Sequence, residues 1–222
     1  MRKTLGGLGS TSAADFLPDT RSLRALAEAS QHCRGCPLYA NATQAVFGEG
    51  PKNASVVFVG EQPGDAEDIA GKPFVGPAGK LLDSVMEEVG IDRSEVYVTN
   101  AVKHFKWTPK GKRRMHAKPS SREMAACRPW LEAELELIKP KVLVCLGATA
   151  AQSLLGRTFR LTKVRGQPFE SDWAKWTMAT YHPSAVLRAK QTDQADEVMA
   201  AFRDDLMGIA RLINSNGQRK PR

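Results

Sequence analysis

The stretch SVVFVGEQPGD, residues 55–65, decides the fold. Residues 55–59 form a continuous apolar run ended by Gly60, which is the pattern of a strand buried on both faces of a sheet. The polar segment Glu61-Gln62-Pro63-Gly64 follows it directly. In open parallel sheets, ligands bind in the crevice beyond the carboxyl ends of the strands. The stretch therefore predicts both a core strand and one part of a binding rim.

Three further runs have the same strand pattern, at residues 96–99, 142–146 and 176–180. Helical patterns separate the runs. Strands that alternate with helices favour a mostly parallel sheet that is covered on both faces. The expected fold class is therefore α/β.

The helices are expected from about residue 19 or 20 towards 33, from about 77 to 90, from 120 to about 138, and from 198 to 213. Ser120 and Glu123 have the spacing of a capping box at the start of the third helix. Gly90 is a stop signal for the second. In the last helix, apolar residues recur at three- and four-residue intervals, which is typical of an amphipathic helix.

The length and composition fit one domain over residues 1–222. Residues 1–18 and 215–222 are small, polar or basic without periodicity, so both ends are expected to be frayed. No run approaches the roughly 20 apolar residues of a membrane span, and the N-terminus has no apolar signal region. A cytoplasmic protein without membrane contact is expected.

The positive charge is concentrated in one segment. The chain carries a net charge of +8, and residues 103–122 contain eight basic residues and no acidic one. The rest of the chain therefore has equal numbers of basic and acidic residues. A concentrated basic patch indicates contact with a polyanion such as nucleic acid. The alternative is a solvated basic loop without a partner.

Polar groups follow each of the four predicted strands. They are the segment 61–64, then Asn100, then Gly147-Ala148-Thr149, and finally Tyr181-His182-Pro183-Ser184. Each segment alone could be only a strand-ending turn. Because the carboxyl ends of parallel strands meet at one edge, the four segments are expected to converge on one rim.

The four cysteines are Cys33 and Cys36, in a C-x2-C motif, followed by Cys127 and Cys145. With no export signal in the sequence, a metal site is favoured over disulfides. Four thiolates suit zinc or an iron–sulfur cluster. The wide spacing of the second pair favours a cluster, while zinc and four ordinary buried thiols stay open as alternatives.

The segment GEQPGDAEDIAGKPFVGPAGKLLD (60–83), the segment HPSAVLR (182–188) and the cysteine layout resemble the iron–sulfur uracil-DNA glycosylases of family 4. The resemblance covers roughly residues 33–188. Within that superfamily, GKRRMH (111–116) and Gln62 resemble the X-type enzymes (UdgX). The X-type insertion usually reads Lys-Arg-Arg-Ile-His, so Met115 is a conservative departure.

The resemblance implies a three-layer α/β/α uracil-DNA glycosylase fold. It implies a four-iron four-sulfur cluster held by Cys33, Cys36, Cys127 and Cys145. It also implies an enzyme that excises uracil from DNA and stays covalently attached to the deoxyribose. The expected partner is uracil-containing DNA in the bacterial nucleoid, with free uracil as a product and a monomeric enzyme.

A glycosylase must first take its base out of the stack, which costs less in single strands, so single-stranded DNA is the expected preference. Phe74 is the candidate platform for the base, although it could be a core residue. Asn100 can donate to O4 and accept from N3–H of uracil with one amide, although asparagine also favours turns.

Negative charge develops on uracil as the glycosidic bond breaks, so catalysis is expected to be electrostatic. His182 and the backbone amides around Gln62 are candidates to bind the developing oxyanion, and Glu61 is a candidate to stabilise the sugar cation. Residues with an expected supporting role in substrate binding are Gly64, Asp65 and Asp68, although the two aspartates could simply cap a turn.

His116 is the candidate nucleophile, because a histidine held close to C1′ can compete with water. Glu61 is expected to accept the second ring proton, which leaves a neutral imidazole that is a poor leaving group. Arg114 is expected to hold the loop over the sugar. Lys112, Arg113 and Ser184 are the candidate contacts to the DNA backbone.

Two rival functions remain open. A conventional turnover glycosylase would use His116 only to contact phosphate and would release an abasic site. A non-catalytic DNA-binding module would leave the rim inert. Of the remaining histidines, His32 could support the cluster, and His104 is expected to be a surface or loop residue.

Overall fold

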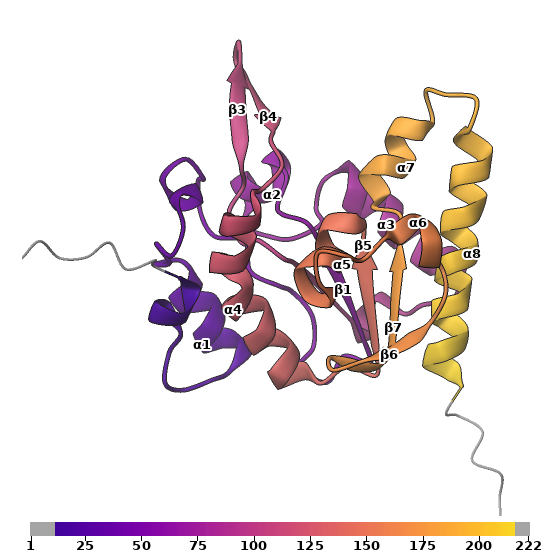
Figure 1. Cartoon of the computed structure of the whole chain (residues 1–222), viewed down its shortest axis with the longest axis horizontal. Helices are drawn as coiled ribbons and strands as arrows, with labels where there is room; N and C mark the ends of the chain where they lie inside the picture. Colours follow the sequence, from indigo (N-terminus) through magenta and orange to yellow (C-terminus); the bar gives the residue numbers. More distant parts are fainter. Residues whose placement is uncertain (1–11, 216–222) are drawn as a thin grey trace, which may run out of the picture.

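The computed structural model describes residues 12–215 (Figure 1). Its centre is a five-stranded sheet with the order β2-β1-β5-β7-β6. The strands are β1 (Val56–Gly60), β2 (Val96–Asn100), β5 (Val142–Leu146), β6 (Phe169–Ser171) and β7 (Ala174–Thr180). All pairs are parallel except β6 with β7. Since β2 and β5 flank β1 on opposite sides, the sheet has its topological switch point between β1 and β5, where ligands bind in such folds.

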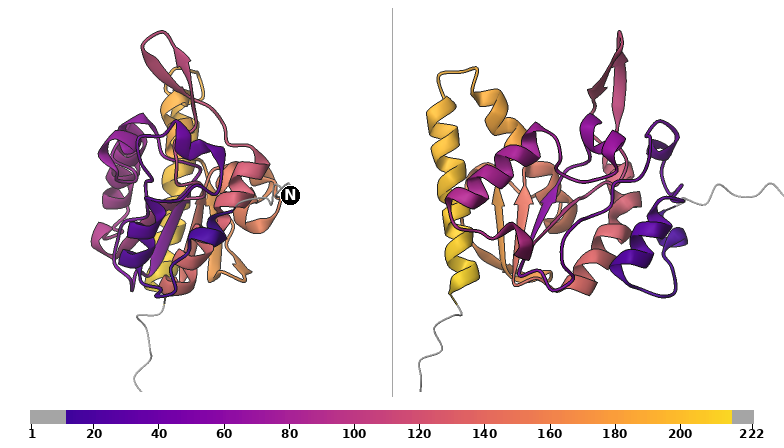
Figure 2. Two further views of the ribbon diagram at one scale, coloured as in Figure 1. Left: turned by 90° about the vertical axis from the view of Figure 1, so that its left-hand side faces the viewer. Right: turned by 180° about the vertical axis from the view of Figure 1, so that it is seen from behind.

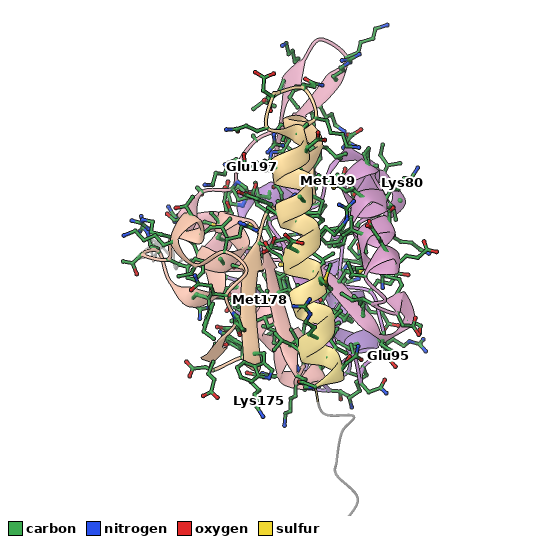
Figure 3. All side chains as sticks on the ribbon, turned by 90° about the vertical axis from the view of Figure 1, so that its right-hand side faces the viewer. Lys80, Glu95, Lys175, Met178, Glu197 and Met199 are labelled. Carbon is green, nitrogen blue, oxygen red and sulfur yellow. The ribbon has the colours of Figure 1, made fainter. Side chains whose placement is uncertain are left out.

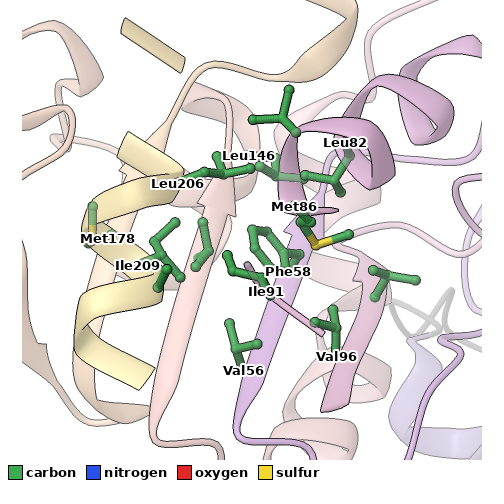
Figure 4. Packing of buried hydrophobic residues seen from close by; sticks show 14 of the residues in the cluster. Val56, Phe58, Leu82, Met86, Ile91, Val96, Leu146, Met178, Leu206 and Ile209 are labelled. Carbon is green, nitrogen blue, oxygen red and sulfur yellow. The ribbon is translucent and has the colours of Figure 1, made fainter. Parts of the chain in front are cut away.

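Three helices cover one face of the sheet. They are α3 (Pro77–Glu88), α7 (Pro183–Ala189) and α8 (Ala195–Asn214). Their apolar side chains pack on alternate residues of the strands, including Val56, Phe58 and Val96 (Figure 4). Seen from the side of α8, this long helix runs along the strands, in front of the sheet (Figure 3). Alternate strand residues are thereby buried on this side, as a two-faced sheet requires.

Two helices cover the other face, namely α4 (Ser121–Ile138) and α5 (Ala148–Leu155). The second core contains Leu131 and Leu135 of α4 together with Val57 and Leu143 of the sheet. A third core lies beyond α4, where η1 (Ala13–Phe16), α1 (Leu23–Ser30) and η2 (Pro37–Ala40) pack on it. The architecture is a three-layer α/β/α domain, as the sequence predicts.

A two-stranded hairpin stands apart from the sheet. It consists of β3 (Trp107–Lys110) and β4 (Arg113–His116), which pair antiparallel. Figures 1 and 2 show the hairpin projecting beyond the carboxyl ends of the central strands, next to α2 (Asp65–Ala70). The remaining short elements are η3 (Arg93–Glu95) and α6 (Leu161–Val164). The basic segment of the sequence is therefore an ordered structure at the binding edge.

Most predicted elements are confirmed, and two predictions are wrong. The predicted strands match β1, β2, β5 and β7 to within two residues, and α4 follows the Ser120 capping box to Ile138. The first helix starts later than expected because Ser22 caps it through the Ala25 amide. Residues 12–18 are not frayed: Ser12 caps η1, and Ala13 is fully buried. Residues 1–11 and 216–222 of the predicted frayed ends lie outside the described residues.

None of the helices in residues 12–215 is both long enough and apolar enough to cross a membrane.

Candidate active site

A cavity of about 700 Å³ opens at the carboxyl ends of the parallel strands. The segments that follow β1, β2, β5 and β7 all contribute to its walls, so the predicted convergence on one rim is confirmed. The size suits a small ligand such as a single base. The predicted site residues that line it are Glu61, Gln62, Gly64, Phe74, Asn100, His116, His182 and Ser184.

Asn100 and Phe74 approach each other over Gly60. A Cβ atom at Gly60 would collide with the Asn100 amide oxygen and lie 2.9 Å from Phe74 Cζ. The missing side chain therefore makes room for both groups at the end of β1. Phe74 has a φ of +57°, which a non-glycine residue adopts only when its surroundings impose it. Its ring stacks on His182, with centroids 6.4 Å apart and an angle of 27° between the planes.

His182 is held as a neutral imidazole with a defined tautomer. Its Nδ1 atom accepts a hydrogen bond from the Ser184 backbone N–H at 3.1 Å. The ring proton is therefore assigned to Nε2. Burial lowers the pKa of His182 to about 4, despite the opposing effect of Glu61. An uncharged ring N–H is thus available in the cavity at neutral pH.

Glu61 stays ionised in spite of being partly buried. Burial acts to raise its pKa, but hydrogen bonds from His116 and Thr149, together with the nearby histidines, outweigh burial and lower the pKa below its ordinary value. Thr149 lies near the start of α5, which also begins at this edge of the sheet. A carboxylate is therefore fixed in the cavity wall between the sheet and the hairpin.

His116 reaches the cavity from the end of β4. Its Nε2 atom lies 3.3 Å from Glu61 Oε1, and 53% of its side chain is exposed. The Phe105 ring lies beside it, with centroids 6.3 Å apart. An imidazole that is half open to solvent and close to a carboxylate can react with a ligand in the cavity.

Gln62 holds the base of the hairpin closed. Its Nε2 atom donates to the carbonyl oxygens of Lys106 at 3.2 Å and Ala117 at 3.0 Å, and its Oε1 atom accepts from the Lys106 N–H at 3.0 Å. These two residues flank the paired strands on either side. The side-chain amide of Gln62 is therefore engaged in positioning the hairpin, and the residue also lines the cavity. The ligand contact expected from the sequence involves the backbone amides around Gln62, not this side chain.

Arg114 fastens the hairpin to α2. Its Nε atom lies 2.6 Å from Asp65 Oδ1, and its Nη1 atom lies 2.6 Å from Asp68 Oδ2. Asp68 has a fully buried side chain and also accepts from the Thr43 hydroxyl at 2.6 Å and the Thr43 N–H. The guanidinium group lies over the Phe105 and Trp107 rings.

Asp65, Asp68 and Arg114, expected to support substrate binding, pair with one another at the hairpin. None of the three is among the described residues that line the cavity. One guanidinium pairs with two carboxylates, and this pairing fixes the hairpin to α2. The prediction that Arg114 holds the loop agrees with this arrangement.

Lys112 and Arg113 lie on the exposed end of the hairpin. In the described part of the chain, neither has an acidic side chain within ion-pair distance. Gly111 allows the turn before them, with a φ of +60°. Both cations are free to meet an anionic partner.

The two neighbouring arginines offer a matched test. Replacing Arg114 with Ala should slow any reaction of His116 by about tenfold to a hundredfold, because a displaced group loses its alignment. Arg113→Ala should instead weaken the binding of a polyanion and reduce the slope of its log binding constant against log salt concentration by about one. The reaction rate at saturating ligand, and the binding of a polyanion measured over a salt series, separate the two effects. Equal rate losses in both variants would contradict a positioning role for Arg114.

Two cavity residues were missed by the sequence analysis. Glu67 is buried and accepts from the Gly64 N–H at 3.1 Å and the Gly76 N–H at 2.8 Å, so it ties together two loops of the cavity wall. Its position three residues after Gly64 is that of a capping box and could have identified it. Thr149, which bonds Glu61, lay within a predicted rim segment but was given no role.

Three of the four cysteines lie together. Cys33, Cys36 and Cys127 are buried in the core formed by η1, α1 and α4. The Trp130 Nε1–H donates to Cys33 Sγ at 3.3 Å. Burial raises the pKa of Cys36 and raises that of Cys127 to about 12. Buried thiols of this kind become thiolates only beside a strong positive charge, such as that of bound metal ions.

Cys145 lies elsewhere. It is in the sheet, paired in register with Val59 and Ala179, and belongs to the core between the sheet and the helices α4 and α5. Burial alone raises its pKa to about 12. The fourth predicted ligand is therefore not beside the other three, because the apolar run around it places it inside a strand. Among the described residues, no set of three or more potential ligands is spaced to bind a single metal ion.

The two remaining histidines have different environments. His104 lies in the loop after β2, which agrees with the expected surface or loop position only as to the loop, since the residue is 4% exposed. Burial lowers the pKa of His104 to about 4. His32, considered as a support for the cluster, is exposed.

Buried neutral histidines predict a loss of stability in mild acid. Between the ordinary pKa of 6.5 and the folded value of about 4, unfolded His104 and His182 bind protons that the folded state does not. The free energy of unfolding should therefore be highest above pH 6.5 and fall as the pH decreases towards 4. Urea titrations across this range should show the fall, and it should be smaller in the His104→Gln variant. If the free energy of unfolding fell equally with pH in both proteins, His104 would not be the source of the fall.

Known proteins resemble this chain over most of its length. The family profile described as "Uracil DNA glycosylase superfamily" matches residues 47–206. A Type-4 uracil-DNA glycosylase from Thermotoga maritima is 41% identical over 193 residues, which cover 86% of this chain and 95% of the relative. Another from Archaeoglobus fulgidus is 41% identical over 72% of this chain and 80% of its own length. A Type-5 uracil-DNA glycosylase from Thermus thermophilus is 30% identical over 81% of this chain and 84% of its own.

Proposed function

The chain belongs to the uracil-DNA glycosylase superfamily, and we propose that this enzyme excises uracil, preferably from single-stranded DNA, and then stays bonded to the deoxyribose through His116. The observation that supports the covalent outcome is the position of His116. It extends from an anchored hairpin into the cavity, 3.3 Å from a carboxylate oxygen of Glu61. A glycosylase that only activates water has no need for a second imidazole at this point.

Uracil would enter the cavity as a flipped-out base. Phe74 offers an aromatic face that is already fixed by its stacking on His182, and stacking on such a ring is worth roughly 1 to 3 kcal/mol per base. The Asn100 amide lies next to that ring at the end of β2. One amide can donate to O4 and accept from N3–H, whereas cytosine reverses both requirements. The pair therefore supports a specific preference for uracil.

Cleavage would be driven by charges fixed in the cavity. The N1–C1′ bond breaks with its electron pair moving to uracil, and the sugar becomes positively charged. The His182 Nε2–H and the backbone at Gln62 are placed to stabilise the uracil anion. The Glu61 carboxylate is placed to stabilise the sugar cation. The low pKa of His182 keeps it a neutral donor throughout the physiological range.

His116 would then capture the sugar. A ring nitrogen forms the new bond to C1′ with its lone pair, and the imidazolium loses its other ring proton to Glu61, directly or through a water. The departed uracil anion is protonated from solvent, so the charges balance. The neutral N-alkyl imidazole that remains is a poor leaving group, and the adduct persists.

The DNA strand would approach along the hairpin and α7. Lys112 and Arg113 are exposed for phosphate contacts, and Ser184 lies in the cavity wall at the start of α7. Phosphate contacts of this kind make binding weaker as salt increases. Uracil-containing DNA in the cytoplasmic nucleoid is the proposed target, with the enzyme acting as a monomer.

We further propose an iron–sulfur cluster at Cys33, Cys36 and Cys127. The donor set fits in chemistry and burial, since these three thiols share one core and need a positive partner to ionise. When bound, such a cluster supplies a rigid cross-link between the N-terminal segment and α4. Cys145 is excluded from the proposed ligand set by its place in the sheet.

The ligand set predicts opposite results for two cysteine variants. Cys127→Ala should lose the iron and the visible absorption of the purified protein. Cys145→Ala should retain both and lose only about 1 to 2 kcal/mol of unfolding free energy, as expected for a small buried side chain. Iron and sulfide analysis of both variants gives the answer. Loss of iron from the Cys145→Ala variant would show that Cys145 is a ligand. Zinc in place of iron in the natural protein would contradict the proposal of an iron–sulfur cluster.

The experiment that tests the function uses a labelled single-stranded oligonucleotide with one uracil. After incubation with the enzyme, the sample is boiled in detergent and run on a denaturing gel beside an alkali-treated sample. A band at the mass of protein plus DNA supports the covalent outcome. A free oligonucleotide that alkali cleaves at the uracil would mean ordinary turnover, and an intact oligonucleotide would contradict catalysis on this substrate.

A further inference from the structure

The interior contains an ion pair that has no part in the proposed mechanism. The Lys103 and Glu134 side chains are 1% and 0% exposed, and Lys103 Nζ lies 2.5 Å from Glu134 Oε2. A fully buried lysine is rare, because the desolvation of two charges can exceed their mutual attraction. A single apolar pair of similar volume would fill the same space. The position of the pair therefore calls for an explanation beyond packing.

One side of the pair fixes the strand end that carries Asn100. Lys103 Nζ donates to the Asn100 carbonyl oxygen at 2.9 Å and to Thr99 Oγ1 at 2.7 Å. Glu134 accepts a further hydrogen bond from Tyr97 Oη at 2.8 Å. All three partners belong to β2. The ammonium group thus sets the backbone position from which the Asn100 amide reaches into the cavity.

The backbone of Lys103 contacts one of the buried cysteines. The Lys103 backbone N–H donates to Cys127 Sγ at 3.2 Å. Glu134 lies on α4, the helix that also carries Cys127. The positive charge of Lys103 acts to lower the pKa of Cys127, although burial outweighs it. One residue is therefore bonded both to Asn100 and to a proposed cluster ligand.

Two aromatic side chains lie between the ammonium group and a second cysteine. Lys103 Nζ lies 5.3 Å from the centre of the Phe47 ring, which packs edge-on against Trp130. Trp130 in turn bonds Cys33 Sγ. In this dry region a fixed charge acts over several ångströms with little screening. A change of charge at the cysteines would be felt directly by Lys103.

We propose that Lys103 is a positioning residue that couples the iron–sulfur site to the recognition of uracil by Asn100. This rests on the proposed function, in which Asn100 reads the base and Cys33, Cys36 and Cys127 hold a cluster. The same ion pair then acts on two sites. The Lys103–Glu134 pair sets the reduction potential of the cluster and also the affinity for uracil. Neither effect follows from a role in packing alone.

The test compares Lys103→Met, Glu134→Gln and the double variant that combines them. The double variant removes both charges, keeps similar volumes, and leaves a side-chain oxygen to accept from Tyr97 and Gly48. It should therefore fold even if Lys103→Met alone, with an unpaired buried carboxylate, does not. The matched control removes the exposed pair Arg128–Glu132 from the same helix, as Arg128→Met with Glu132→Gln.

Two quantities are measured on the purified, iron-loaded proteins. The midpoint potential of the cluster should be lower in Lys103→Met and higher in Glu134→Gln than in the natural protein, because a neighbouring cation favours the reduced cluster. The half-saturating concentration of a uracil oligonucleotide should rise about tenfold in the double variant. Binding of the same oligonucleotide without uracil should not change. The control pair should alter none of these values.

Each outcome separates the coupling from the proposed function. Natural potentials in both single variants, together with natural uracil dependence in the double variant, would overturn the coupling. If the double variant did not fold, Glu134→Gln alone would decide, and an unchanged potential there would overturn it as well. Failure of the natural protein to excise uracil would contradict the proposed function, whereas shifted potentials in the variants would still identify Lys103 as the partner of the cluster.

Discussion

Replacing His116 with Ser should abolish the covalent adduct and convert the enzyme into one that releases abasic DNA. The serine is too short to reach the position of the imidazole 3.3 Å from Glu61. It leaves the groups proposed for cleavage, on the ends of the sheet strands, unchanged. Water then takes the place of the imidazole at C1′. The band at the mass of protein plus DNA should fall by at least about a hundredfold, while alkali-labile product accumulates over several turnovers.

Met115 provides the matched control for this experiment. It precedes His116 on β4, so its side chain points to the opposite face of the hairpin, and it is 43% exposed. Met115→Ser should retain the adduct. Persistence of the crosslink in the His116→Ser variant would assign the bond to another residue and show that His116 is not the nucleophile.

Replacing Glu61 with Gln should slow uracil excision by about a hundredfold to ten thousandfold. The amide has the same shape and can still bond His116 and Thr149, so only the charge is lost. That charge is the group placed to stabilise the sugar cation and to accept the proton of His116. Because the pKa of Glu61 lies below its ordinary value, the natural enzyme should keep this carboxylate ionised into mild acid. Single-turnover release of uracil at saturating enzyme measures the effect.

The combination of the two substitutions distinguishes the roles of Glu61. If the carboxylate acts on cleavage, Glu61→Gln should be slow even when His116 is already Ser. If it only orients the imidazole, the second substitution would add nothing to the first. The double variant therefore shows whether cleavage of the base, and not only capture of the sugar by His116, depends on the Glu61 carboxylate.

The sheet could be predicted because its signals are local. The buried strands are continuous apolar runs, and the Ser120 capping box marks the start of α4 to the residue. The hairpin could not be predicted in the same way. Its strands are polar and largely exposed, and their placement depends on Gln62 and on the contact of Arg114 with Asp68. These contacts join segments that are more than forty residues apart in sequence.

The rim residues were predictable for a topological reason, since each follows a strand that ends at the same edge. The cysteines show the limit of such reasoning. Their number and spacing predicted one set of four ligands, whereas the structure places Cys145 in one core and the other three cysteines in another. Cys145 lies within the apolar run VLVCL, in the middle of a buried strand. The burial of His104 could not be predicted either, since a position in a loop does not by itself indicate burial.

The hairpin also has a consequence for how such an enzyme can evolve. The groups proposed to cut the base from the sugar lie at the ends of the sheet strands, and the sheet is held by pairing between its strands and by packing on both faces. The group proposed to capture the sugar sits on an appendage attached mainly through Gln62 and Arg114. Selection can therefore alter the fate of the product by changing a few residues of the appendage. The residues proposed to choose the base, Phe74 and Asn100, lie outside the hairpin, so such changes would leave the choice of base unaltered.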